Sequence, residues 1–249
     1  MKNAIEVKDL IITYGDNNAV LWKTNGSIPE KSLTAIVGPN GAGKSTLVKS
    51  IIGAIKPHKG KIKINNILIK DISNKHQLIS YVPQRDSLDD NFPICCLDVV
   101  LMGRYGKLGW IKRPSKSDKD AAMNALEKFG MHMLANKQIG ELSGGQKQRV
   151  LLARSFLQDS EIIILDEPFG GIDIKTEKII LDLLKELRDK GKTVLVITHD
   201  LDSLKDHFDY VWLLNIHTVA FGKPDEVLTK ENLIHCYGGS VHLLQHEDN

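Results

Sequence analysis

Residues 33–45 read LTAIV-GPNGAGKS, a short apolar run that leads directly into a glycine-rich loop. The loop fits the pattern G-x-x-x-x-G-K-[ST], which cradles phosphates between a strand and a helix. Glycine lets backbone N–H groups turn inward where a Cβ would clash, and the N-terminus of the following helix attracts negative charge. The stretch therefore predicts a phosphate-loop NTPase core. The residues expected to hold a nucleotide here are Gly38, Pro39, Asn40, Gly41, Ala42, Gly43, Lys44, Ser45 and Thr46.

Two side chains of this loop have separate expected roles. Lys44 reaches the β- and γ-phosphates, and the Ser45 hydroxyl ligates Mg²⁺, as in other phosphate-loop enzymes. The expected ligands are therefore ATP and Mg²⁺.

A second apolar run, residues 162–165 (IIIL), precedes a pair of acids. Ligands of open α/β sheets bind at the carboxyl ends of the strands, and Asp166 and Glu167 follow this strand directly. Asp166 suits the Mg²⁺ shell, through water. Glu167 suits a catalytic base that orients the attacking water.

The remaining apolar runs are also short and continuous, which is typical of strands covered on both faces of a parallel sheet. They occupy residues 194–197 and 211–214, and helices are expected at 44–55, 117–129, 146–158 and 175–190. Gly191 should end the last of these helices. Alternating patterns near Ile5 and Ile62 indicate a flanking antiparallel sheet. Residues 85–149 show no strong strand pattern, which predicts a helical insertion.

The segment LSGGQ, residues 142–146, lies roughly a hundred residues after the phosphate loop. Ser143 is a good helix N-cap, and the glycines that follow expose backbone N–H groups at a helix start. The sequence therefore predicts a second anion site. Within one chain, two such sites could serve two ligands.

Composition narrows the functional classes. The chain has 249 residues, of which 26% are charged, and a formal net charge of +2. A net charge this small gives no strong positive electrostatic potential that would favour binding to nucleic acid. Three cysteines are too few for a disulfide framework. The start MKNAIEVKDL carries acids where a secretory signal would be apolar, and no run approaches the ~18 apolar residues of a membrane-spanning helix. We expect an intracellular protein whose membrane role comes through a partner.

Taken together, these motifs resemble the ATP-binding-cassette ATPases over nearly the whole chain, in the order and spacing of that family. The resemblance implies that Tyr14 stacks on adenine and that Gln84 touches Mg²⁺ and the water. It implies that Asp173 lies in the loop that crosses a dimer interface and that His199 holds the γ-phosphate. It also places two chains head to tail, so that the signature residues Ser143, Gly144, Gly145 and Gln146 of one chain complete the site of the other.

The resemblance implies a domain layout. It is a single domain over residues 1–240, with a RecA-like core at 1–84 and 150–225 and a helical subdomain at 85–149. A C-terminal extension covers residues 225–249. In fold class this is an α/β phosphate-loop NTPase core with a flanking antiparallel β-sheet and an inserted α-helical subdomain.

Residues 98–110 and the segments around the signature resemble the manganese, zinc and iron importer branch. The implied activity is ATP hydrolysis that drives uptake of a divalent metal. The implied partners are a second copy, a membrane permease and, indirectly, an extracytoplasmic metal-binding protein, with the chain at the cytoplasmic face of the inner membrane. Apolar residues of the helical lobe would receive the permease; they are Phe92, Ile94, Leu97 and Tyr105.

Other interpretations stay open. An iron-chelate or siderophore importer shares the fold. A chromosome-structure, repair or translation cassette would need coiled-coil arms or tandem cassettes, and this chain has neither. A nucleotide-gated binder without turnover conflicts with intact Glu167 and His199. A metal site among the last histidines is a further hypothesis; its residues are His235, Cys236, His242 and His246.

Overall fold

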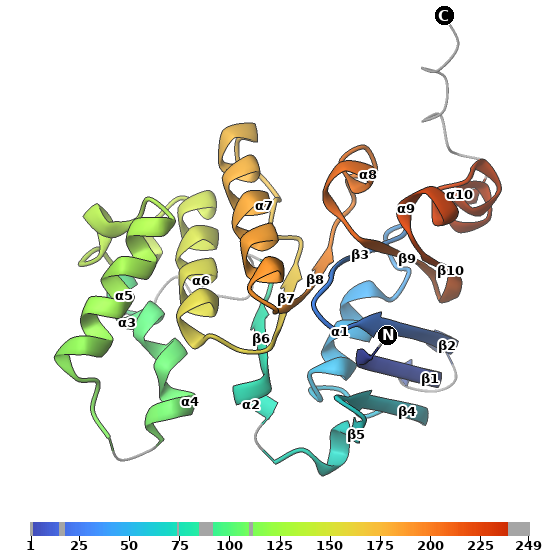
Figure 1. The fold of residues 1–249 in the computed structure, drawn as a ribbon, viewed down its shortest axis with the longest axis horizontal. Helices are drawn as coiled ribbons and strands as arrows, with labels where there is room; N and C mark the ends of the chain where they lie inside the picture. Colours follow the sequence, from blue (N-terminus) through green and yellow to red (C-terminus); the bar gives the residue numbers. More distant parts are fainter. Residues whose placement is uncertain (1, 15–17, 74, 85–91, 110–111, 239–249) are drawn as a thin grey trace, which may run out of the picture. The chain divides into compact units, whose positions relative to one another are not determined.

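The computed structural model describes residues 2–14, 18–73, 75–84, 92–109 and 112–238. The chain divides into two compact units, Met1–Ser73 with Leu181–Asn249 (unit 1) and Asn74–Ile180 (unit 2). Helix α7 (Ile174–Asp189) runs from one range into the other. Figure 1 traces the chain through both units.

Unit 1 contains the predicted antiparallel sheet. Its strands are β1 (Asn3–Tyr14), β2 (Asn18–Pro29), β4 (Lys59–Ile64) and β5 (Ile67–Leu68), in the order β2-β1-β4-β5. Ile5 pairs with Ile28 on one side and Ile64 on the other, and all three are fully buried. The alternation near Ile5 and Ile62 is thus explained by one buried face of this sheet.

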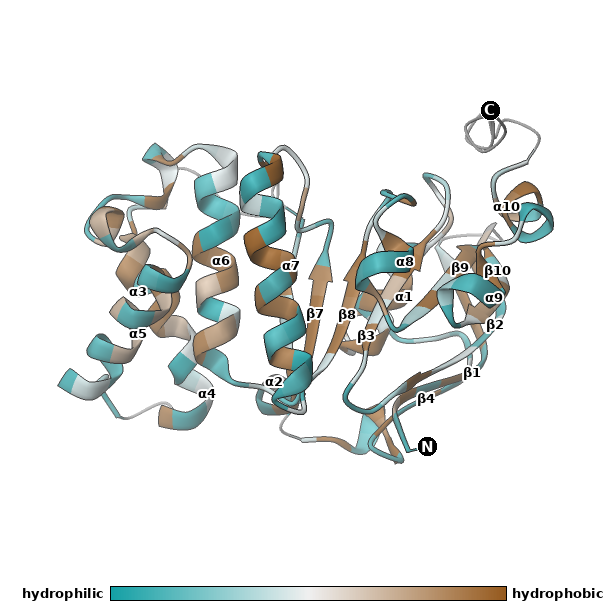
Figure 2. Cartoon of the chain, turned by 45° about the horizontal axis from the view of Figure 1, so that its top comes forward, coloured by the Kyte–Doolittle hydropathy of each residue, from teal (hydrophilic) through white to brown (hydrophobic). Residues whose placement is uncertain are grey.

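The second layer of unit 1 is a mostly parallel sheet. Strand β3 (Leu33–Val37) lies between β8 (Thr193–Ile197) and β9 (Tyr210–Asn215) and is parallel to both, and β10 (His217–Gly222) pairs antiparallel with β9. Every residue of β3 and β8 is buried, and Figure 2 shows both strands as strongly hydrophobic. The continuous apolar runs therefore correspond to strands without a solvent face.

The helices of unit 1 are short. They are α1 (Lys44–Ile51), the 3₁₀ turn η1 (Ile69–Asp71), α8 (Leu204–His207), α9 (Pro224–Val227) and α10 (Lys230–Tyr237). The predicted helix at 44–55 was too long, because Gly53 takes φ 79° and the N–H groups of Gly53 and Ala54 bond back to Ser50 and Lys49. This paired capping pattern ends a helix through a left-handed residue. Helix α7 ends as predicted, with Gly191 at φ 87° in the same pattern.

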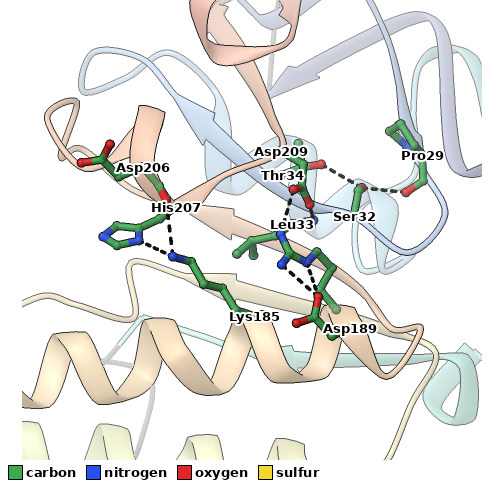
Figure 3. A network of polar contacts seen from close by, with 10 residues as sticks. Pro29, Ser32, Leu33, Thr34, Lys185, Asp189, Asp206, His207 and Asp209 are labelled. Atoms are coloured by element: carbon green, nitrogen blue, oxygen red, sulfur yellow. Dashed lines mark hydrogen bonds and ion pairs between the residues drawn. The ribbon is translucent and has the colours of Figure 1, made fainter.

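A polar network at the start of β3 joins this strand to α7 and to the residue before β9 (Figure 3). Asp209 accepts the backbone N–H of Leu33 at 2.8 Å and the guanidinium of Arg188 at 2.8 Å. The hydroxyl of Ser32 is buried and donates to the Pro29 carbonyl at 2.7 Å. Serine is accommodated here because its hydroxyl has a partner.

Unit 2 combines two parallel strands with a helical cluster. The strands are β6 (Ile79–Val82) and β7 (Ile162–Asp166). The helices are α2 (Lys75–Leu78), α3 (Cys96–Leu101), α4 (Tyr105–Leu108), α5 (Lys116–Lys128) and α6 (Gly144–Gln158), with 3₁₀ turns η3 (Met102–Arg104), η4 (His132–Leu134) and η5 (Ile139–Glu141). Helices α3, α5 and α6 pack on one another, and α6 also packs on β6.

The predicted helical insertion is present. Within the described part of residues 85–149, extended pairing is limited to an isolated bridge between Cys95 and Gln138. The compact unit is wider than 85–149, because α6 packs on α3 and α5 and also on β6, which pairs with β7. The functional division into core and helical subdomain stays a prediction.

Candidate nucleotide site

The phosphate loop lies between β3 and α1, as predicted. Gly41 has φ 82° and Gly43 has φ 90°, conformations that disfavour other residues. The Lys44 ammonium donates to the carbonyls of Gly38 at 2.7 Å and Pro39 at 2.9 Å. The loop thus folds back on the buried side chain of Lys44, which is the first residue of α1. Such a loop offers backbone donors and a positive charge to a phosphate.

Gly38 is required for a different reason from Gly41 and Gly43. A Cβ on this residue would stand 1.9 Å from the Leu214 carbonyl oxygen in β9. The loop is tied to the same region at its other end, since the Ile216 N–H donates to the Ala42 carbonyl at 3.0 Å. The β9–β10 turn thus supports the phosphate loop from the side of the sheet.

The C-terminal helix reaches the same place. The Cys236 thiol donates to the Leu214 carbonyl at 3.6 Å, and the Asn215 amide donates to the Cys236 carbonyl at 2.8 Å. Burial raises the pKa of the Cys236 thiol to about 11, and burial also raises the pKa of Tyr237 to about 12. Both groups are therefore neutral at physiological pH. These supports of the phosphate loop were not recognised from the sequence.

Two further predicted residues of unit 1 are accessible. Tyr14 is at the end of β1 with 53% of its surface exposed, as an adenine-stacking ring requires. His199 is exposed just after β8, whose end is held by a hydrogen bond from Thr198 N–H to the Ile36 carbonyl at 3.2 Å.

Unit 2 brings the two proposed water-positioning residues together. The Gln84 amide donates to the Glu167 carboxylate at 2.7 Å, although the residues are 83 positions apart. The parallel pairing of β6 with β7 explains this contact, because Gln84 and Glu167 each follow the carboxyl end of one of these strands. Glu167 also has φ 50°, a left-handed conformation uncommon for glutamate. Such strain persists where the surrounding structure enforces it, often at functional sites.

Asp166 is buried and accepts a hydrogen bond from the Tyr81 hydroxyl at 3.2 Å. Burial, followed by the negative charge of Asp166, raises the pKa of Tyr81 far above its usual range. Tyr81 therefore stays a neutral donor that fixes the carboxylate. A tyrosine in a strand gave no signal of this role, which depends on the register of β6 against β7.

The signature segment forms the predicted helix start. Ser143 is the N-cap of α6, with its hydroxyl accepting the Gln146 N–H at 3.4 Å while Gln146 accepts the Ser143 N–H at 3.0 Å. This reciprocal capping box fixes the first turn of the helix. Ser143 is exposed, and Gly144 and Gly145 are half-buried. The predicted helix at 146–158 began two residues late, because the glycines are already helical.

Asp173 starts α7 in a similar way. Its carboxylate accepts the backbone N–H of Thr176 at 3.0 Å and the Thr176 hydroxyl at 2.7 Å. These hydrogen bonds, the hydroxyl contributing most, lower the pKa of Asp173. The residue is exposed and ionised, so it is available to a partner.

The apolar residues expected to dock a permease are not core. Phe92 and Tyr105 are 58% and 50% exposed, and Ile94 and Leu97 are half-buried.

The metal site among the last histidines stays a hypothesis. His242 and His246 lie outside the described residues. Among the residues that are described, no three His, Cys, Asp or Glu side chains are grouped so as to hold an ion. The adjacent residues Cys95 and Cys96 differ in burial, because Cys96 is buried and Cys95 is half-buried.

The fold and the loop define a phosphate-loop NTPase, and comparison with known proteins gives the family. The ABC transporter family model matches residues 21–170. The chain belongs to the ATP-binding-cassette transporter family. Of its helices in the described ranges, none combines the length and apolar character needed to cross a bilayer.

Individual relatives are similar over almost their whole length. The chain is 48% identical to the manganese transport system ATP-binding protein MntB of Bacillus subtilis, covering 97% of this chain and 95% of the relative. It is 45% identical to the zinc transport system ATP-binding protein TroB of Treponema pallidum, covering 96% and 88%. It is 41% identical to the chelated iron transport system protein YfeB of Yersinia pestis, covering 98% and 84%.

Solved structures agree on the fold. A metal-chelate type ABC transporter in an inward-facing conformation superposes with a TM-score of 0.80 at 32% identity, covering 95% of this chain and 89% of that one. A dimeric ATP-binding cassette bound to ADP and Pi superposes with a TM-score of 0.79 at 29% identity, covering 88% and 98%.

Proposed function

We propose that this chain is the ATP-hydrolysing motor subunit of an importer that carries a divalent metal cation, manganese, zinc or iron, through a membrane permease. The observation that carries the proposal is the phosphate loop together with a capped LSGGQ helix, in a chain 48% identical to a manganese-system ATP-binding protein. A nucleotide binder needs only the loop. An exposed second anion site at the start of α6 adds a surface for a partner's nucleotide.

The residues of unit 1 fit a nucleoside triphosphate. The loop turns at two glycines with left-handed backbone, Gly41 and Gly43, and its lysine is positioned by two loop carbonyls. We assign the β- and γ-phosphates to residues 38–46, the adenine to the exposed ring of Tyr14, and the γ-phosphate also to His199.

The hydrolytic step is assigned to unit 2. Glu167 accepts a hydrogen bond from the attacking water and polarises it, while Gln84 holds the Glu167 carboxylate. The water oxygen forms a bond to the γ-phosphorus, and its proton passes through the Glu167 carboxylate to the released phosphate. The bond from this phosphorus to the bridging oxygen breaks with its electron pair staying on ADP, and ADP and phosphate leave. The positive φ of Glu167 is a strained backbone conformation of the kind that is often kept at functional sites.

Mg²⁺ is the expected companion of ATP. Ser45, Gln84 and the buried carboxylate of Asp166 are the oxygen donors we assign to it, which are the ligand types that this hard cation prefers. When bound, Mg²⁺ would neutralise charge on the phosphates.

A second copy of the chain completes each site in our proposal. Ser143 and the two glycines of one copy contact the γ-phosphate bound by the other, with Asp173 at the crossing loop. ATP then holds two copies together and hydrolysis releases them, a switch based on γ-phosphate contacts. A solved relative of the same fold is a dimer in a post-hydrolysis state with ADP and Pi, which supports the association of two copies.

The permease is assigned to the exposed apolar residues Phe92 and Tyr105 with their half-buried neighbours. Large exposed apolar side chains are a feature of protein interaction surfaces. The chain would then lie at the cytoplasmic face of the membrane, with a metal-binding protein delivering cargo on the other side.

The alternative is an importer of chelated iron. It is favoured by the similarity to YfeB and to a metal-chelate type transporter. The two cases differ in cargo only, because selectivity lies in other subunits.

Deletion of the gene tests the function and separates these cases. Cells lacking the chain should lose accumulation of one metal, and the Lys44→Ala variant should not restore it while the unchanged chain does. Loss of free Mn²⁺, Zn²⁺ or Fe²⁺ uptake supports the divalent-metal importer, and loss of only chelated iron uptake supports the alternative. Unchanged content of all three metals would overturn both.

A further inference from the structure

Two histidines from separate elements meet on the surface of unit 1. His217 begins β10 and His235 lies in α10, and their ring centroids are 5.9 Å apart with the ring planes inclined by 56°. Both side chains are exposed. Figure 1 shows α10 beside β10, and the two elements are in contact.

The backbones that carry these rings are firmly held. The residue before His217, Ile216, donates to Ala42 in the phosphate loop at 3.0 Å and accepts the Trp22 N–H at 2.8 Å. The residue after His235, Cys236, is buried and accepts a hydrogen bond from Asn215 at 2.8 Å. The rings are therefore presented by two fixed segments, which reduces the ordering needed to bind a common ligand.

We propose that His217 and His235 form an open binding site for a zinc-class transition-metal ion. A Zn–N bond is about 2.0 Å, so two imidazoles on one ion have centroids roughly 5 to 6 Å apart. The observed separation is in that range, and small side-chain rotations bring one ring nitrogen of each histidine to the ion. Each nitrogen donates its lone pair and the other ring nitrogen keeps its proton.

The chemistry of the pair selects among cations. Imidazole nitrogen binds Zn²⁺, Ni²⁺ and Cu²⁺, whereas Mn²⁺ prefers oxygen ligands and stands at the weak end of the first-row series. No third protein ligand is grouped with the pair in the described residues, so water completes the coordination. The site is thus expected to respond to zinc and not to manganese.

An ion at this position would connect two segments that support the phosphate loop. It would clamp the β9–β10 turn to α10, and both segments touch the phosphate loop region, through Ala42 and through the Leu214 carbonyl beside Gly38. The site is distinct from the predicted nucleotide ligands, and its existence does not depend on the transport function.

Zinc titration of the full-length chain, free of nucleotide, tests the proposal. Isothermal titration calorimetry should show saturable Zn²⁺ binding that weakens at least tenfold in the variant carrying His217→Ala and His235→Ala. Binding should be unchanged in a control with the exposed residues His58→Ala and His132→Ala. Mn²⁺ should bind at least tenfold more weakly than Zn²⁺.

A second pair of variants distinguishes the source of any binding. The change of His242→Ala with His246→Ala should leave Zn²⁺ affinity within twofold. Zn²⁺ should also raise the Tm of the parent and not of the His217/His235 variant, since a ligand stabilises the form that binds it. Unchanged affinity in the His217/His235 variant, loss of affinity in the tail variant, or Mn²⁺ binding equal to Zn²⁺ would overturn the proposal. Should the alanine variant fold poorly, His217→Gln and His235→Gln, taken singly, give the same comparison.

Discussion

At the residue scale, Glu167 is held by its strained backbone and by Gln84 at 2.7 Å. A positioned general base contributes about 10²- to 10⁴-fold to a rate. We therefore expect Glu167→Gln to lower the steady-state ATPase rate at least 100-fold, while ATP still binds. The measurement is phosphate release at saturating ATP, with Glu127→Gln, at an exposed position of α5, as the control. A rate within threefold of the parent would remove Glu167 from the role of base.

Two glycines of the phosphate loop offer a matched comparison. Gly38→Ala places a Cβ 1.9 Å from the Leu214 carbonyl oxygen, whereas Gly41→Ala meets no atom within 4 Å and suffers only its φ of 82°. Left-handed strain costs about 1–2 kcal/mol, and overpacking of a rigid backbone costs about 1–3 kcal/mol or more. Urea unfolding should therefore show a larger loss for Gly38→Ala. Equal losses would mean that the loop can move away from β9.

At the element scale, the start of α5 contains a carboxylate that couples helix stability to pH. Asp118 accepts from the Ser115 hydroxyl at 2.6 Å, from the Ser115 N–H at 2.9 Å and from Arg104 at 3.0 Å. These bonds, led by the Ser115 hydroxyl, lower the pKa of Asp118 to about 2. Because the folded pKa is below the unfolded value of about 3.9, the stabilisation is complete above pH about 5 and is lost as pH falls toward 2.

The test is a series of thermal melts between pH 2 and pH 7. Asp118→Asn should have a lower Tm than the parent at pH 7, and the difference should shrink as pH falls from about 4 to about 2. Asp120→Asn, on the exposed side of the same helix, should show no such trend. A Tm difference independent of pH would mean that the charge of Asp118 contributes nothing to α5.

At the scale of the whole molecule, the signature predicts that nucleotide controls association. The isolated chain should be a monomer by multi-angle light scattering, and Glu167→Gln with ATP should be a dimer, because hydrolysis no longer removes the γ-phosphate. Adding Ser143→Arg should prevent this dimer by placing bulk and charge at the start of α6. A monomer in Glu167→Gln at saturating ATP would contradict the head-to-tail arrangement.

Coupling to the permease is also a property of the whole molecule. The double change Phe92→Asp and Tyr105→Asp should lower metal uptake by cells at least tenfold, since it puts charge on the apolar docking surface. ATP affinity of the isolated chain should stay within twofold. Met133→Asp is a matched control in unit 2, because Met133 is 83% exposed and lies outside the docking set. Normal uptake in the double variant would exclude this surface as the coupling site.

Much of the fold could be predicted because its signals are local. Strand β3 has the predicted bounds and α6 ends at the predicted residue, since a continuous apolar run and a capped amphipathic stretch each define an element without help from the rest of the chain. The predicted end of α1 was wrong, because the helical sequence pattern runs on to Ile55 while the capping at Gly53 ends the helix earlier. The extent of unit 2 could not be predicted either, because the packing of α6 on β6 leaves no local pattern in the sequence.

The sequence alone determined that this protein binds a nucleoside triphosphate, because the phosphate loop, the strand-end acids and the capped LSGGQ helix are each written in consecutive residues. Only the tertiary structure decided which side chains support them. The pairing of β6 with β7 brings Gln84 to Glu167 and Tyr81 to Asp166, and the packing of α10 on β10 brings His235 to His217. Such contacts depend on strand register and helix packing, which join residues far apart in the chain and leave no local pattern.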